Sequence, residues 1–306
     1  MARTVGVMGM GNVGSTVAHI IVAQGLADTL ILYDRNQDKV KADTLDFQDA
    51  ASLLSTHTTI INGQISDMKD CDIIVSAIGR IDLIVPGSVD RFAELKTNAP
   101  SVAELSKDLK NSGFKGILLV ITNPNDVITG LYQKHTGFPT HKVLGTGTYL
   151  DTSRLKRHVG EALNIDPRSV SGYVLGEHGD SQFAAWSTVR VEGRPFTEIA
   201  KEKGIDLDQL EKDTRFGGGE VHVGKGYTNY AVATAATSLI QIMFSDAKTE
   251  AICSHYNEDF AGYISSPAIL GKNGVEKVLE LPLTDPENEN LKKSAQTIKE
   301  KSEQFG

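Results

Sequence analysis

The chain has 306 residues, long enough to bury a large core, and its 40% hydrophobic and 23% charged residues are typical of a globular protein. Its formal net charge of −8, without a basic stripe, argues against nucleic-acid binding, and it has no apolar run long enough to cross a membrane. The two cysteines, Cys71 and Cys253, form no C-x-x-C pair, and no signal-peptide pattern precedes the first strand. We therefore expect a soluble, cytoplasmic α/β protein without a disulfide framework or a metal site.

The first half of the chain alternates short apolar runs with helical patterns. Continuous apolar runs of this length are typical of buried parallel strands. Strands are predicted at 3–8, 29–33, 73–78 and 117–122. Helices are predicted between Gly14 and Gly25, at 39–54 and at 91–109. This alternation predicts a Rossmann-type doubly wound parallel sheet over residues 1–145.

The pattern changes in the second half, residues 146–306, for which we expect an α+β substrate-binding domain. A helix is predicted at 150–163, then strands at 170–175 and 183–191, then long amphipathic segments. Helices are predicted at 230–244 and at 286–305, where Pro286 suits a first turn. No flexible linker separates the halves, so they are expected to pack as one rigid unit.

A glycine motif, Gly9-x-Gly11-x-x-Gly14, lies between the first predicted strand and its helix. In this context the glycines permit a tight turn and a close approach of the backbone to a pyrophosphate, which the helix N-terminus around Asn12 and Val13 attracts. Asp34 follows Gly14 by 20 residues (34 − 14) at the end of the second strand, where it can accept the hydroxyls of a ribose. The predicted cofactor is NAD, although the adjacent Arg35 leaves NADP open.

Candidate reactive residues follow in three places. His178 lies in a glycine-containing break between the two strands of the second half, where a presented imidazole suits proton transfer. Asp151 and Arg154 are three residues apart on one helix face, either as part of a site or as a surface ion pair. Asn123 directly follows a buried strand at the edge where such sheets bind ligands, as a binding residue or only as a turn residue.

Together these motifs resemble the L-lactate/malate dehydrogenase family over nearly the whole chain, and within it the L-2-hydroxyisocaproate dehydrogenase branch. The motifs that carry the resemblance are Gly9-x-Gly11-x-x-Gly14, Thr122-Asn123-Pro124, Gly145-x-Gly147-Thr148-x-Leu150-Asp151-x-x-Arg154, Gly176-Glu177-His178-Gly179-Asp180-Ser181 and Lys225-Gly226-Tyr227-Thr228. The family uses NAD, reduces 2-oxo acids to L-2-hydroxy acids, and forms homodimers or homotetramers, so the resemblance implies the same here.

The resemblance also implies a role for each matching residue. His178 resembles the proton donor and acceptor, and Asp151 the carboxylate that orients it. Arg154 resembles the arginine that grips the substrate carboxylate, and Arg91 the loop arginine that polarises the reacting carbonyl. Asn123 and Thr228 resemble residues that line the same pocket, with Asn123 also beside the cofactor. A planar guanidinium suits bidentate binding of a carboxylate, which supports these assignments.

The loop before Arg91 departs from the lactate dehydrogenase pattern. It spans twelve steps from Gly79 (91 − 79), three more than is typical of lactate dehydrogenases. The residue that selects the substrate corresponds to Ile84, or to another of the apolar residues nearby: Ile81, Leu83 or Val85. With no cation among these, a second substrate carboxylate would be unpaired, so malate dehydrogenase activity is not expected. An apolar loop favours a larger, branched 2-oxo acid, and pyruvate as the main substrate is the alternative.

Two other functions, a nucleotide sensor and a metal-dependent glycosidase, fit the sequence less well. A nucleotide sensor without chemistry would be expected to lack at least one of His178, Asp151, Arg154 and Arg91, all of which are present. An NAD- and metal-dependent glycosidase would need a Cys/His metal pair, for which neither cysteine has suitable spacing.

Overall fold

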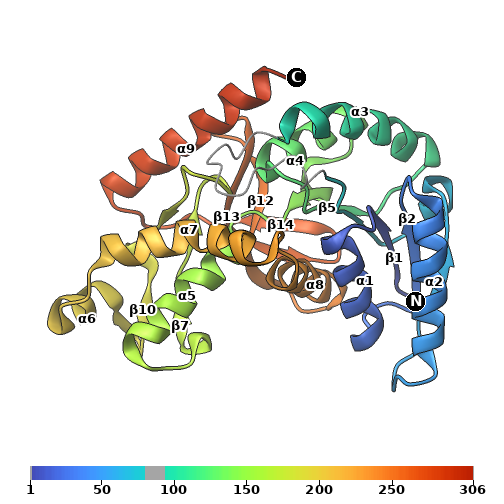
Figure 1. Ribbon diagram of the computed structural model, residues 1–306. Helices are drawn as coiled ribbons and strands as arrows, with labels where there is room; N and C mark the ends of the chain where they lie inside the picture. The colour runs from blue at the N-terminus through green and yellow to red at the C-terminus, as the bar shows by residue number, and fades with distance from the viewer. Residues whose placement is uncertain (1, 80–93, 306) are drawn as a thin grey trace.

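The computed structural model describes residues 2–79 and 94–305 (Figure 1). Its central sheet runs in the order β14-β13-β12-β6-β5-β4-β1-β2-β3. Six of these strands are parallel: β1 (Thr4–Met8), β2 (Thr29–Tyr33), β3 (Thr59–Asn62), β4 (Ile73–Ser76), β5 (Ile117–Val120) and β6 (Val143–Gly145). The strand order reverses between β1 and β4, which opens a crevice at the carboxyl ends of the strands.

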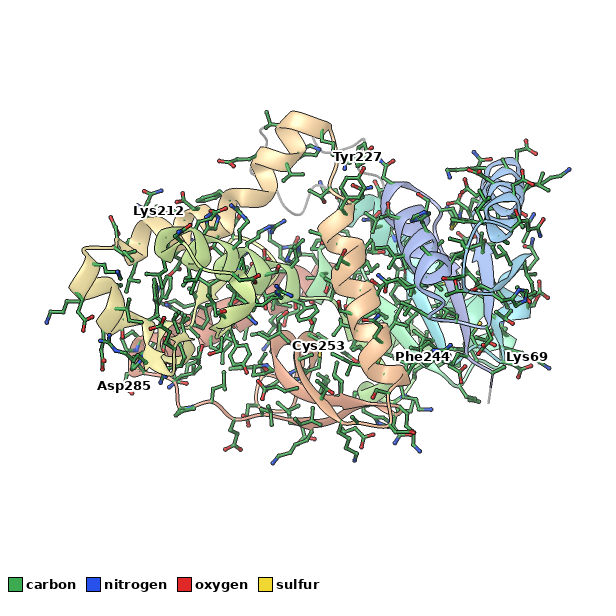
Figure 2. The ribbon with its side chains drawn as sticks, turned by 90° about the horizontal axis from the view of Figure 1, so that it is seen from below. Lys69, Lys212, Tyr227, Phe244, Cys253 and Asp285 are labelled. Atoms are coloured by element: carbon green, nitrogen blue, oxygen red, sulfur yellow. The ribbon has the colours of Figure 1, made fainter. Side chains whose placement is uncertain are left out.

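Helices cover both faces of this sheet because the strand side chains alternate between two cores. Leu30 and Leu32 point into the first core, with α1 (Asn12–Gln24), α2 (Gln37–Ala51) and α8 (Tyr230–Phe244). Ile31, between them, points into the second core, with α3 (Leu95–Ser112), α4 (Asn125–Thr136) and α9 (Asp285–Glu303). Figure 2 shows Tyr227 and Phe244 near the two ends of α8.

The second half of the chain extends the same sheet. The strands β12 (Thr249–Asn257), β13 (Gly262–Gly271) and β14 (Gly274–Val278) are antiparallel, and β12 pairs with β6 at Ser254 and Gly145. A smaller core gathers around α5 (Tyr149–Leu163), α6 (Phe196–Lys203) and α7 (Leu207–Lys225). Short strands complete it: β7 (Val170–Ser171), β8 (Val174–Leu175), β9 (Phe183–Ala184), β10 (Arg190–Val191) and β11 (Arg194–Pro195).

The predicted α/β architecture is confirmed, and the structure corrects the two strands around His178. Gly172, at a φ of 123°, breaks the run 170–175 into β7 and β8, and a 3-10 turn at Trp186–Thr188 separates β9 from β10. The helix predicted at 91–109 is described only from Leu95 onward, where α3 begins. His178 therefore lies between two strands of two residues each, β8 and β9, which pair with each other.

Candidate active site

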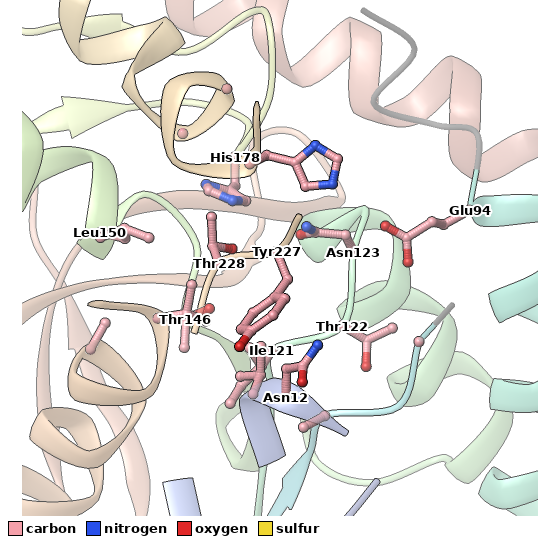
Figure 3. Close-up of a pocket in the computed structure, with 18 of the residues that line it drawn as sticks. Asn12, Glu94, Ile121, Thr122, Asn123, Thr146, Leu150, His178, Tyr227 and Thr228 are labelled. Carbon is pink, nitrogen blue, oxygen red and sulfur yellow. The ribbon is translucent and has the colours of Figure 1, made fainter. Parts of the chain in front are cut away.

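A cavity of about 430 Å³ lies at the carboxyl ends of four parallel strands. Its walls include the turns after β1, β4, β5 and β6 and the end of α7. Figure 3 shows His178 and Asn123 toward one end of this cavity and Asn12 toward the other, with Tyr227 between them in the view. The volume suits a small-molecule ligand, and the place is the one predicted from the reversal of strand order.

The glycine turn forms one end of the cavity. Gly9 has a φ of 92°, and a Cβ on Gly14 would lie 1.7 Å from the Gly9 carbonyl oxygen, so both positions require glycine. A Cβ on Gly11 would meet nothing within 4 Å, which leaves this side open to a ligand. Gly11, Asn12 and Val13 line the cavity, and α1 begins there without a side-chain cap, so its first amides face it. These residues fit a dinucleotide phosphate.

Asp34 lies beside this turn, outside the cavity lining. Its Oδ2 accepts a hydrogen bond from the Met10 amide at 2.7 Å, and its Oδ1 accepts one from the Asn36 amide at 2.9 Å. The next residue, Arg35, forms an ion pair with Glu104 on α3. Because that guanidinium already has a partner, the arrangement favours a ribose hydroxyl over a 2′-phosphate at Asp34.

The His178 side chain and Arg154 meet on one buried carboxylate, that of Asp151. Asp151 Oδ2 lies 2.5 Å from His178 Nδ1, and its Oδ1 accepts a hydrogen bond from Arg154 Nη1 at 2.7 Å. Asp151 itself has no solvent exposure, whereas His178 and Arg154 reach the cavity. The carboxylate therefore holds an imidazole and a guanidinium toward the same space, and its burial shows that the surface ion-pair alternative is wrong.

The short loop that carries His178 is held by a second buried carboxylate, Glu177. Its Oε2 accepts hydrogen bonds from the Ser181 hydroxyl at 2.5 Å and the Ser181 amide at 3.2 Å. The Glu177 amide donates to Ser294 Oγ on α9 at 2.7 Å. Burial raises the pKa of Glu177, and hydrogen bonds from Ser181 oppose that rise.

The remaining lining residues come from distant parts of the chain. The Asn123 carbonyl accepts a hydrogen bond from Asn98 Nδ2 at 2.8 Å, which ties this turn to α3. Thr228 and Tyr227 line the cavity from the turn between α7 and α8. The Arg154 guanidinium packs against α7 at Gly218, where a Cβ would lie 3.0 Å from Nη2.

The structure thus brings most of the predicted site residues together. Gly9, Gly14 and Asp151 stand directly behind the lining, and Asp34 lies beside the glycine turn. The predicted residues in the lining itself are Gly11, Asn12, Val13, Asn123, Arg154, His178 and Thr228. Arg91 and Ile84 lie in the segment 80–93, outside the described residues.

Sequence reasoning missed the buried carboxylates beside His178. Glu177 directly precedes His178 in the sequence, and a carboxylate next to a presented histidine is a signal that the sequence alone contains. Asp126 on α4 accepts a hydrogen bond from the His178 amide, and burial raises the pKa of the Asp126 carboxyl. The sequence gives only a weaker indication of this residue, its position shortly after Asn123-Pro124. Among residues 2–79 and 94–305, no group of three or more potential metal ligands occurs, and no helix is long and apolar enough to span a membrane.

Comparisons of the sequence and the structure with known proteins all match lactate/malate dehydrogenases. Residues 3–145 match the family model described as lactate/malate dehydrogenase, NAD binding domain, and residues 148–305 match the lactate/malate dehydrogenase, alpha/beta C-terminal domain. The chain is 35% identical to L-lactate dehydrogenase 1 of Bifidobacterium longum, covering 97% of this chain and 96% of that protein. It is 37% identical to L-lactate dehydrogenase of Mycoplasma capricolum, over 97% and 95%. The ligand-bound minor L-lactate dehydrogenase of Enterococcus mundtii superposes with a TM-score of 0.93 at 30% identity, covering 99% of this chain and 98% of that one.

Proposed function

The chain belongs to the lactate/malate dehydrogenase family, and on that premise we propose that it interconverts pyruvate and L-lactate. It is an NAD-dependent oxidoreductase that acts on 2-hydroxy acids. The observation that carries the proposal is the Asp151 carboxylate, which holds His178 and Arg154 at the wall of a cavity that also contains the glycine turn. Pyruvate is favoured because relatives that match nearly the whole chain are named L-lactate dehydrogenase.

The residues around the glycine turn would hold the cofactor. The first amides of α1 would bind the pyrophosphate, and the Asp34 carboxylate would accept the ribose hydroxyls of the adenosine. When bound, NADH supplies the hydride that reduces the carbonyl carbon. Asn123 lines the same cavity directly after β5, together with the glycine turn and His178, and would border both ligands.

Arg154 binds the carboxylate of the substrate. Its guanidinium carries two parallel donors that match a planar carboxylate, and its ion pair with Asp151 fixes the fork toward the cavity. Only 14% of the Arg154 side chain is exposed, so the substrate would meet a partly desolvated cation. Thr228, in the turn between α7 and α8, lines the same cavity.

His178 supplies the proton during reduction. Asp151 pairs with Nδ1, so Nε2 is the nitrogen left to face the substrate oxygen. In its imidazolium form the ring can protonate the oxygen as negative charge develops on it. Arg91, from its resemblance to the family's loop arginine, would stabilise that same charge.

The substrate side chain is the point on which two candidates differ. The apolar residues around Ile84 favour a branched 2-oxo acid, whereas the named relatives favour pyruvate. If the loop borders the pocket, the three additional carbons of 4-methyl-2-oxopentanoate would gain about 2 kcal/mol, which is about 30-fold in kcat/KM.

The test is NADH oxidation by the purified chain with pyruvate, 4-methyl-2-oxopentanoate and oxaloacetate. We expect the highest kcat/KM with pyruvate and the lowest with oxaloacetate. A kcat/KM about 30-fold higher for 4-methyl-2-oxopentanoate than for pyruvate would instead support a hydroxyisocaproate-type dehydrogenase. Absence of turnover with all three acids would contradict the proposal and favour a nucleotide sensor.

We also propose a division into an NAD-binding domain at 1–145 and a substrate domain at 146–306, which the two family matches support.

We propose that the chain forms a homo-oligomer, either a dimer or a tetramer, because apolar side chains are exposed at its surface. These include Leu45, Leu53, Val221 and Tyr230. Light scattering would test the oligomeric state. Two buried, free cysteines support a reducing compartment, the cytoplasm.

A further inference from the structure

A buried carboxylate lies beneath the backbone of His178. Asp126, in the first turn of α4, is only 2% exposed. Its Oδ2 accepts a hydrogen bond from the His178 amide at 2.7 Å, and its Oδ1 accepts one from the Ser265 hydroxyl at 3.1 Å. Aspartate is rarely buried to this degree unless its charge is paired, because desolvation is costly. Asp126 instead receives two neutral donors, one of which is the backbone of the proton-donating residue.

Ser265, on β13, joins this carboxylate to two other parts of the site. Its hydroxyl also accepts a hydrogen bond from the Thr148 amide at 3.2 Å. Its backbone pairs with Gly176 in both directions at 3.0 Å, two residues before His178. Thr148 is the N-cap of α5, the helix that carries Asp151 and Arg154 three and six residues further on (151 − 148 and 154 − 148).

We propose that Asp126 and Ser265 are positioning residues that set His178 relative to Asp151 and Arg154, an inference that rests on the proposed function. The His178 loop and the start of α5 are also joined directly, by His178 Nδ1 and Asp151 Oδ2 at 2.5 Å and by hydrogen bonds of the Val174 backbone with the hydroxyls of Thr148 and Thr152. Asp126 adds the contact that holds the backbone amide of His178 itself. Holding both through one serine and one carboxylate keeps the imidazole and guanidinium in a single geometry toward the substrate.

A carboxylate fits position 126 because two donors converge on it. Each oxygen of Asp126 accepts one of them, and neither oxygen has to donate. In Asp126→Asn the amide oxygen can still accept from the His178 amide, but the amide nitrogen can only donate, so the bond to Ser265 has to reverse and the hydroxyl hydrogen of Ser265 loses its acceptor. Both remaining bonds then join neutral groups and are weaker.

The experiment uses the full-length chain and compares Asp126→Asn and Ser265→Ala with wild type. The control is Ser106→Ala, a buried serine on α3 outside this cluster. We expect kcat/KM for pyruvate to fall about 10- to 100-fold in Asp126→Asn and about 3- to 30-fold in Ser265→Ala, mainly through kcat. NADH affinity should stay within twofold of wild type, since neither residue lines the cavity, and the control should keep full activity.

The division of the loss between kcat and KM separates a positioning role from a purely structural one. In both variants the loss should fall on kcat, while the KM for pyruvate stays near the wild-type value. A purely structural role would instead lower the melting temperature and the amount of folded chain, with the kinetic constants of the folded molecule unchanged.

Three results would overturn the inference. One is wild-type kcat/KM in both variants, within twofold. Another is a parallel loss of NADH affinity and thermal stability with unchanged turnover per folded molecule. The third is a loss that falls on the KM for pyruvate in both variants, with kcat unchanged. A wild-type chain without any 2-oxo acid turnover is a different outcome, because it contradicts the proposed function itself.

Discussion

Replacing Asp151 by asparagine tests the centre of the proposed mechanism. The carboxylate is wholly buried and accepts from both His178 Nδ1 at 2.5 Å and Arg154 Nη1 at 2.7 Å. Asparagine has almost the same shape but one acceptor oxygen and no charge, so one hydrogen bond is lost and the other loses its charge assistance. Losing one hydrogen bond to a charged group costs about 1.5–3 kcal/mol, and the loss of charge assistance in the other costs about 1–1.5 kcal/mol more, which is about 2.5–4.5 kcal/mol in total. That corresponds to about a 10²- to 10³-fold loss of rate.

The assay is kcat/KM for pyruvate reduction, with NADH affinity measured separately by fluorescence. NADH affinity should not change, since Asp151 lies behind the cavity lining. The matched control is Asp166→Asn, which breaks a surface pair with Arg168 and should leave activity unchanged. A loss of less than threefold in Asp151→Asn, with NADH binding intact, would refute the reasoning.

Three further outcomes are expected. Arg154→Lys should raise the KM for pyruvate roughly 100-fold without changing NADH affinity, because an ammonium cannot bind a carboxylate bidentately; an unchanged KM in steady-state assays would place the substrate carboxylate elsewhere. Asp34→Ser should weaken NADH binding about tenfold and narrow the preference over NADPH, measured by titration with both cofactors. Burial raises the pKa of Cys71 and of Cys253 to about 12, so neither thiol should react with a chromogenic disulfide at pH 8 until the chain unfolds.

The parts of the site that sequence alone could locate are those with local signals. The turn from Gly9 to Gly14 is recognisable because its glycines are close in sequence and lie between a strand and a helix. Asp151 and Arg154 are three residues apart on one helix, so their contact follows from helix geometry. The contact between Asp151 and His178 spans 27 residues, and only the resemblance to a known family indicated it before the structure did.

The antiparallel extension of the sheet could not be located in this way. Ser254 and His255 on β12 are buried, so the strand lacks the apolar alternation by which a half-exposed strand is recognised. His255 Nε2 lies 2.8 Å from the hydroxyl of Ser266 on the neighbouring strand, β13. A buried polar residue is tolerated when its partner is present, and that partner becomes visible only once the strands are paired.

The same reasoning explains why the position of His178 is a property of the whole second half. The strands that flank it, β8 and β9, have two residues each and cannot by themselves fix a side chain to within the tolerance that proton transfer needs. Its ring is oriented from α5, its amide from α4, and the adjacent Glu177 amide from α9. Each of these contacts spans at least 27 residues of sequence. Substitutions far from the cavity in sequence should therefore change turnover wherever they move one of these three helices, even when cofactor binding is untouched.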